Sequence, residues 1–141
     1  MTAEFSVAVH ALVYLVHRDC LVSSEVLADN ICTNPARVRK VMTKLHHAGL
    51  VDAERGKGSG YRCTARTEKA TLKQIMLALG EEPVSISWRS GDIDRDCQVS
   101  SGMGAVMDGV YEKLNGACFD WLDTVTVESI VGTLFQDKQV K

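Results

Sequence analysis

The chain has 141 residues, of which 45% are hydrophobic and 24% are charged, and its formal net charge is −2. This length suits one compact domain, or one domain with a small appended element, and no apolar run reaches the roughly 20 residues that cross a bilayer. Five cysteines at wide spacings do not form the disulfide framework of a small secreted protein, so we expect reduced thiols and a cytoplasmic location.

Charge is unevenly distributed along the chain. Residues 1–70 carry ten Lys and Arg against seven Asp and Glu, whereas residues 71–141 carry six against eleven. Within the first half, residues 35–69 hold nine bases and three acids. A basic segment followed by an acidic one suggests a surface for a polyanion and a separate part for assembly, although an ordinary solvated surface explains the charges equally well.

The first two predicted helices span residues 3–17 and 24–31. Apolar side chains recur at helical spacing through the first helix and cover nearly its whole circumference, which predicts a buried helix. Ser23 and Ser24 offer hydroxyl groups that can cap the second helix. An acidic residue follows in its first turn, where the helix dipole favours negative charge.

The third predicted helix spans residues 35–48 and is the most informative element. Asn34 supplies a polar cap, and Pro35 takes the first helical position, where its missing N–H costs nothing. Gly49 ends the helix as a left-handed residue. Apolar residues at helical spacing form one face, so cations occupy the side away from the core. These cations are Arg37, Arg39, Lys40 and Lys44.

Two strand-like runs, residues 50–55 and 61–64, flank the glycine-rich turn 56–60 and predict a β-hairpin. The tip of this hairpin carries Arg55 and Lys57. Two helices, a third helix after a turn, and then a hairpin are the order of elements in a winged helix-turn-helix. The sequence therefore predicts a mainly α fold with a small β-hairpin wing.

In a winged helix-turn-helix, the third helix can enter a major groove while the hairpin tip reaches the adjacent minor groove. Arg37 and Arg39 are the candidates for base contact, because arginine can bind guanine bidentately, and Asn34 and the wing add specificity. The remaining candidates contact phosphates or the minor groove. They are Lys40, Lys44 and Arg62 for phosphates, Ser23 and Ser24 for phosphate at a helix N-terminus, and Arg55 and Lys57 for the minor groove.

The second half begins with a predicted helix over residues 71–79 and a loop over residues 84–98. A helix of about five turns follows, with an apolar stripe that is longer than a small globule needs. Such a stripe predicts packing against a partner, and four glycines along this helix would let a second helix approach closely. The stripe residues expected at a dimer interface are Val106, Met107, Val110, Leu114 and Trp121.

These elements divide the chain into three parts. Residues 1–83 are expected to form the DNA-binding domain, and residues 84–98 the loop. Residues 99–137 are expected to form the dimerisation helix and a C-terminal helix that packs on the first helix.

Several segments carry a family resemblance: Ala11-Leu12, Tyr14-Leu15, Ser23-Ser24-Glu25-Val26-Leu27-Ala28, Asn34-Pro35-Ala36-Arg37-Val38-Arg39-Lys40-Val41, Leu45-His46-His47-Ala48-Gly49-Leu50-Val51 and Arg55-Gly56-Lys57-Gly58-Ser59-Gly60-Tyr61. In these segments the chain resembles the Rrf2-type transcriptional regulators, and the order of elements agrees over nearly its whole length. In the wing, where that family commonly has Gly-Gly-Tyr, Ser59 replaces the first glycine. The resemblance implies a homodimeric bacterial repressor or activator that binds a pseudo-palindrome, with the long helix as the dimer interface.

The loop before the long helix departs from the family pattern. Cluster-binding members carry three cysteines a few residues apart in this loop, whereas this chain has only Cys97, with Asp92, Asp94 and Asp96 around it. One thiolate cannot hold a [2Fe–2S] centre, which needs about four ligands. We therefore expect no cofactor and a place in the cluster-free branch. Cys97 is either a redox-sensing thiol or an incidental cysteine, since the helix N-terminus lowers its pKa while the three aspartates raise it.

The prediction is a DNA-binding regulator that acts as a homodimeric repressor, with no catalytic or metal-binding residues and an effector that remains to be identified. One alternative is a winged-helix module that binds a protein partner. That class would carry acids on the third helix, and residues 35–50 contain none. Another alternative is a thiol redox protein that uses Cys97. That class would carry a resolving cysteine nearby, which the loop lacks.

Overall fold

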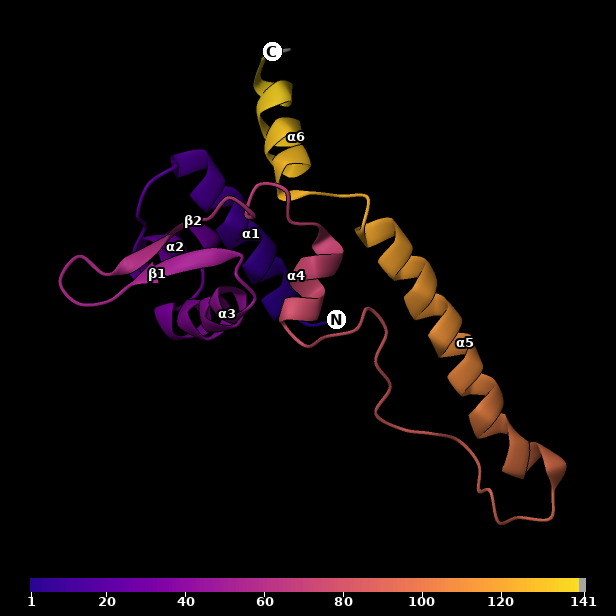
Figure 1. The fold of residues 1–141 in the computed structure, drawn as a ribbon. Coiled ribbons are helices and arrows are strands. Elements are labelled where there is room, and N and C mark those ends of the chain that lie inside the picture. Colours follow the sequence, from indigo (N-terminus) through magenta and orange to yellow (C-terminus); the bar gives the residue numbers. More distant parts are fainter. Residues whose placement is uncertain (140–141) are drawn as a thin grey trace.

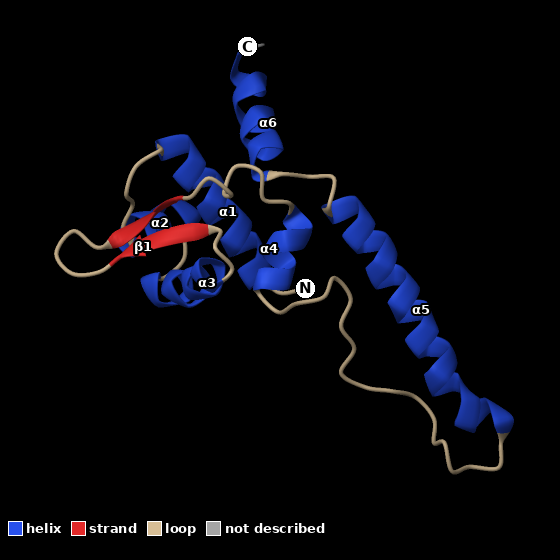
Figure 2. Cartoon of the chain, in the orientation of Figure 1, coloured by secondary structure: helices blue, strands red, loops and turns tan. Residues whose placement is uncertain are grey.

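The computed structural model describes the backbone of residues 1–139 and the side chains of residues 1–136 (Figure 1). Its fold is mainly α with one two-stranded antiparallel hairpin, which confirms the predicted class (Figure 2). The elements in chain order are α1 (Ala3–Arg18), α2 (Ser24–Ile31), α3 (Pro35–His47), β1 (Val51–Glu54), β2 (Gly60–Cys63), α4 (Leu72–Ala78), α5 (Gln98–Leu122) and α6 (Val127–Gln139).

Local capping explains where the helices begin and end. The side-chain oxygen of Asn34 accepts a 2.8 Å hydrogen bond from the backbone N–H of Arg37 and so starts α3. Gly49 takes φ +76° immediately after α3, a left-handed conformation that glycine adopts without strain. At α4, Thr71 and Gln74 cap each other's backbone N–H groups in a capping box. These boundaries lie within about two residues of those predicted from the sequence.

The core surrounds α1, which packs against α2, α3, α4 and α6. Leu12 and Leu15 of α1 are fully buried, and Val38 and Leu45 bring the apolar face of α3 against them. Each such side chain contributes about 1.5–3 kcal/mol through removal of apolar surface from water. Because this face of α3 is held in the core, the opposite face of α3 points to solvent.

The hairpin is joined to the body at its root. Val51 pairs with Cys63 and Glu54 pairs with Gly60. The first strand therefore ends one residue before the predicted end at residue 55, and Arg55 lies in the turn. Tyr61 forms an isolated bridge with Val22, which precedes α2. A Cβ atom at Gly60 would lie 2.6 Å from the carbonyl oxygen of Val22, so only glycine allows this approach. The wing therefore has a fixed root and a projecting tip.

The segment between α5 and α6 is bonded to the start of α4. The N–H of Leu72 donates to the carbonyl of Val125 at 2.9 Å, and the N–H of Val127 donates to the carbonyl of Ala70 at 3.0 Å. From there α6 packs on α1, and the helix ends at Gln139, two residues beyond the predicted end at residue 137. This connection ties the C-terminal helix to α4 and through it to the core.

Helix α5 projects from the body as a long arm (Figure 1). Only Gly104 and Leu122 of this helix are buried. The arm leaves a large part of its side-chain surface exposed within one chain. None of the helices in the described part combines the length and hydrophobicity that a bilayer crossing requires.

Candidate nucleic-acid interface

The exposed face of α3 carries the predicted base-contacting residues. Arg37 is exposed, and among the described residues its guanidinium makes no hydrogen bond or ion pair. Its backbone N–H is the one that Asn34 caps, so the side chain leaves from the first turn of the helix. A free guanidinium at this position can bind an external acceptor without first breaking an internal bond.

Arg39 is held against the start of α2. One of its guanidinium nitrogens donates to the hydroxyl of Ser24 at 3.2 Å and lies 3.5 Å from the carboxylate of Glu25. The Arg39 side chain is still 53% exposed, so solvent screens this ion pair. The contact orients Arg39 toward α2 and offsets part of its charge. The sequence did not predict this partner, because the two helices meet only in the folded chain.

The two lysines of α3 point in different directions. Lys40 lies 3.8 Å from the carboxylate of Glu4, at the start of α1. The half-buried Lys44 donates from Nζ to the carbonyl of Leu79, just after α4, at 3.4 Å. The structure therefore holds Lys44 against the end of α4, although the sequence placed all the cations of α3 on the side away from the core.

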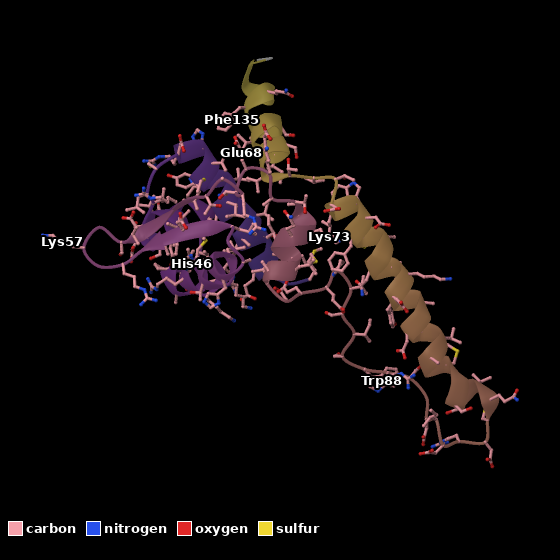
Figure 3. The ribbon with its side chains drawn as sticks, in the orientation of Figure 1. His46, Lys57, Glu68, Lys73, Trp88 and Phe135 are labelled. Atoms are coloured by element: carbon pink, nitrogen blue, oxygen red, sulfur yellow. The ribbon has the colours of Figure 1, made fainter. Side chains whose placement is uncertain are left out.

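The wing presents two exposed cations at its tip. Figure 3 shows Lys57 at the end of the hairpin farthest from the body, and Arg55 is exposed in the same turn. Gly56 and Gly58 take φ +89° and +81°, which lets the turn close tightly without bulk. On the strand behind it, Arg62 pairs with the carboxylate of Glu54 at 2.8 Å. The tip cations are thus more available to an external anion than Arg62.

A hollow of about 390 Å³ lies between α3, the start of α2 and the wing. Its walls include Arg39, Arg55 and Tyr61, so one predicted cation of α3 and one of the wing lie on one concave surface. Burial raises the pKa of the Tyr61 hydroxyl, so this group stays neutral and can donate a hydrogen bond. Further lining residues that the DNA-contact prediction omitted are Thr43, His46 and His47.

The side-chain oxygens of Ser23 and Asn34 are already used to start helices. Ser23 accepts the N–H of Val26 at 3.2 Å, as Asn34 does for Arg37. Both residues keep hydrogen-bond donors, the hydroxyl proton of Ser23 and the amide NH₂ of Asn34, which could serve a phosphate or a base. The buried Ser24 instead donates to Glu25 at 3.2 Å and accepts from Arg39.

A strap of residues 84–92 runs along one face of α5. Asn115 exchanges two hydrogen bonds with the backbone of Val84, at 2.8 and 3.0 Å. Farther along, Arg89 binds Asp108 through two nitrogens, at 3.0 and 3.2 Å, and its guanidinium fills the space over Gly104. The N–H of Asp92 donates to the carbonyl of Ser100 at 3.0 Å. The sequence prediction gave this segment only as a loop and missed these contacts.

Cys97 occupies the cap position of α5 and is exposed. Its sulfur accepts no capping hydrogen bond of normal geometry. The amides of Ser100 and Val99 at the helix start nevertheless lower the pKa of the Cys97 thiol. The neighbouring aspartates, which were expected to raise this pKa, are not among the groups that shift it.

The donor set of this region does not fit an iron site within one chain. In the part of the chain that the structure describes, no three His, Cys, Asp or Glu side chains gather where they could hold a metal ion. After Cys97 the next cysteine is Cys118, about 30 Å away along α5 at 1.5 Å per residue. A [2Fe–2S] centre needs about four ligands close together.

The face of α5 away from the strap carries the predicted interface stripe. Val110 is 42% exposed, Leu114 46% and Trp121 62%, all large fractions for apolar side chains. Val106 is exposed as well, so an apolar stripe follows the arm. Met107 is different, because it lines a hollow of about 460 Å³ under the strap, next to Trp88 (Figure 3).

Comparisons with known proteins agree with this architecture. The sequence pattern of the Rrf2 family, described as an iron-dependent transcriptional regulator, matches residues 1–133. A candidate HTH-type transcriptional regulator of Neisseria meningitidis serogroup A is 29% identical over 94 residues, which is 67% of this chain. The match spans 60% of that relative's length.

Two solved structures are similar over nearly the whole chain. A candidate transcriptional regulator from Lactobacillus plantarum has a TM-score of 0.78 and 25% identity, with 99% of this chain and 98% of that chain covered. The protein named IscR from T. potens has a TM-score of 0.69 and 18% identity, with 95% of this chain and 87% of that chain covered. The second likeness concerns the fold alone.

Proposed function

The chain belongs to the Rrf2 family of transcriptional regulators, and from this premise we propose that it binds a pseudo-palindromic operator as a homodimer without an iron–sulfur cluster. The family is described as one of transcriptional regulators. We expect the bound dimer to repress transcription, because a dimer that is bound at a promoter competes with RNA polymerase for the same DNA.

One observation carries the proposal: Arg39 of α3 and Arg55 of the wing line one hollow, and a second exposed cation lies on each of these two elements. Arg37 and Arg39 are exposed on α3, and Arg55 and Lys57 are exposed on the wing. At 1.5 Å per residue the 13 residues of α3 span about 20 Å, which suits a major groove. The wing tip then lies over the neighbouring backbone or minor groove.

Within this arrangement the residues have different roles. Arg37, which has no internal partner among the described residues, is the proposed base contact, because a guanidinium can bind guanine O6 and N7 together. Arg39 must break its ion pair with Glu25 before it can contact a base or a phosphate. Loss of this exposed ion pair makes DNA binding by Arg39 slightly less favourable. Lys40, Lys57 and Arg62 supply charge to phosphates and set position rather than sequence.

The arm supports the homodimer. A twofold pair of α5 helices would cover the exposed stripe and set two α3 helices at a fixed spacing. Paired recognition helices read half-sites about one helical turn apart, which is why the operator is expected to be a pseudo-palindrome. The absence of a fitting donor set in the described part of one chain supports regulation without a cluster.

The test is selection of bound DNA from a random pool, followed by affinity measurements at two salt concentrations. A recovered palindrome is expected, and the affinity should fall steeply with salt because phosphate binding releases counterions. The Arg37→Ala variant should lose about 1–3 kcal/mol of discrimination between the selected site and a site mutated at one base pair.

The matched control is Lys73→Ala, since Figure 3 places Lys73 on α4, away from the wing tip. This variant should keep the affinity and its salt slope. Two results would contradict DNA recognition by this surface. One is that the selected DNA molecules share no common sequence. The other is that the DNA affinity depends on salt no more steeply than that of an unrelated acidic protein.

A further inference from the structure

A hollow of about 580 Å³ lies between α1 and α6, on a side of the molecule that the DNA proposal does not use. Helix α1 supplies one wall and α6 the other, and Asn30 of α2 and Leu72 of α4 also line the hollow. Its volume falls within the roughly 300–1,000 Å³ that is typical of small-molecule sites. The lining residues from the two long walls are Phe5, Val9, Val13, Tyr14, Leu134 and Phe135.

The side chains that line the hollow indicate which class of ligand it can bind. No Lys, Arg, Asp or Glu is among the described residues that line this hollow, so no permanently charged side chain is available to pair with a charged ligand. Aromatic surface is present, because the rings of His17 and Phe135 stack with centroids 4.7 Å apart and an interplanar angle of 22°. Figure 3 shows Phe135 on α6, on the side that faces α1.

A small polar group is placed within this apolar surface. A ring nitrogen of His10 and the side-chain oxygen of Asn30 share a 2.8 Å hydrogen bond, and both residues are exposed where they line the hollow. The second ring nitrogen of His10, the amide NH₂ of Asn30 and the hydroxyl of Ser6 remain as possible hydrogen-bonding groups. Apolar walls with a few convergent polar groups are what ligand pockets share.

We propose that this hollow binds a small, neutral, aromatic molecule that carries one hydrogen-bonding group, and that the molecule regulates DNA binding. The regulatory part depends on the function proposed above. The ligand would place its ring between α1 and α6 and its polar group beside His10 and Asn30.

The position of the hollow couples it to both functional parts of the chain. Helix α1, which forms one wall, packs on α3, and Glu4 in its first turn pairs with Lys40 of α3. Helix α6, the other wall, follows α5 through a segment that is hydrogen-bonded to α4. A ligand that spreads or closes α1 and α6 would therefore move the recognition helix relative to the arm that sets the dimer.

The test uses the full chain and the neutral probe N-phenyl-1-naphthylamine, whose fluorescence rises in an apolar site. Saturable binding of one probe per chain is expected. Val9→Trp should weaken it by about tenfold, because an indole at this half-buried position would fill the space. Leu134→Ser, at a side chain that is 52% exposed and so tolerant of change, should weaken it by about threefold to tenfold.

The matched control is Leu77→Ser, which makes the same change at a side chain that is 56% exposed on α4. This variant should keep probe affinity within about twofold, since Leu77 does not line the hollow. Loss of binding in Leu77→Ser but not in Leu134→Ser would place the probe outside the hollow and overturn the proposal. The absence of saturable probe binding to the wild-type chain would also overturn the proposal. A Leu134→Ser chain that becomes monomeric in ultracentrifugation would overturn it as well, since the hollow would then be an interface between copies.

The regulatory role has its own measurement. Saturating probe should change the dissociation constant for the selected DNA by about fivefold or more, and the change should vanish in Val9→Trp. An unchanged constant would overturn the regulatory role. Because probe binding is measured without DNA, failure of the DNA proposal would leave that titration unaffected, and the two failures can be told apart.

Discussion

At the scale of single residues, chemically similar side chains of α3 have different freedom. Arg37 has no internal partner among the described residues, Arg39 is bonded to Ser24 and faces Glu25, and Lys44 is bonded to the carbonyl of Leu79. A guanidinium that is free can bind DNA at lower cost than one that must first leave a partner. The same type of residue on one helix therefore serves different purposes according to what lies opposite.

Cys97 and Cys63 are predicted to react at different pH values, because their thiol pKa values are shifted in opposite directions. The helix start lowers the pKa of Cys97, whereas burial raises the pKa of Cys63. Because the thiolate is the nucleophile, Cys97 should be alkylated by iodoacetamide at a lower pH than Cys63. Mass spectrometry of the labelled peptides across a pH series measures both rates in one sample.

Cys32 serves as the reference in that experiment, since it is exposed and its sulfur contacts only backbone carbonyls. Reaction of Cys97 at the same rate as Cys63 throughout the series would contradict the effect of the helix start. If Cys97 reacts as predicted, Cys97→Ser tests whether oxidation of this thiol affects DNA binding.

At the scale of elements, the strap shows how polar contacts hold a segment that has no regular structure. Arg89 binds Asp108 bidentately and lies over Gly104, where a Cβ atom would come within 2.5 Å of the guanidinium carbon. Bidentate arginine–carboxylate pairs have defined geometry, so this contact positions the strap along α5. These side-chain contacts thus determine the course of the loop in the described structure.

Gly104→Ala tests the strap. The new methyl group should displace Arg89 from Asp108, and trypsin should then cut after Arg89 and Arg95 several times faster, since release of the strap exposes its backbone. Gly102→Ala is the control, because a Cβ atom there meets nothing within 4 Å. Equal cleavage rates in the two variants would show that Arg89 does not hold the strap.

At the scale of the whole molecule, α5 has one face that contacts the strap and one face that is exposed. One face holds the strap through Asp108 and Asn115, and the other leaves Val106, Val110 and Leu114 exposed. A contiguous exposed apolar stripe is uncommon on a monomeric protein and is typical of an interface. In the proposed homodimer, this stripe is the surface that a second copy would cover.

Val110→Asp tests the dimer. A carboxylate in the centre of a buried helix–helix interface loses its hydration, so the variant should sediment as a monomer and bind the selected DNA at least tenfold more weakly. The control is Val26→Asp on α2, where the side chain is 44% exposed compared with 42% for Val110. A Val110→Asp chain that is still dimeric in ultracentrifugation would contradict this interface.

The sequence by itself determined the elements and the chemistry of their exposed faces. Asn34 followed by Pro35, Thr71 as a cap, and the glycine-rich turn between two strand-like runs act through their immediate neighbours, so local pattern is sufficient to predict them. The periodicity of α3 also predicted that Arg37 and Arg39 would face solvent, because one apolar face must enter the core.

Only the tertiary structure decided which of these side chains have partners and where hollows form. The contact of Arg39 with Ser24 joins residues 15 positions apart, that of Lys44 with Leu79 joins residues 35 apart, and that of Val84 with Asn115 joins residues 31 apart. The hollow between α1 and α6 likewise brings Phe5 and Phe135, from opposite ends of the chain, to one space. Such contacts depend on how whole helices pack, and periodicity within one helix carries no information about the helix that will lie against it.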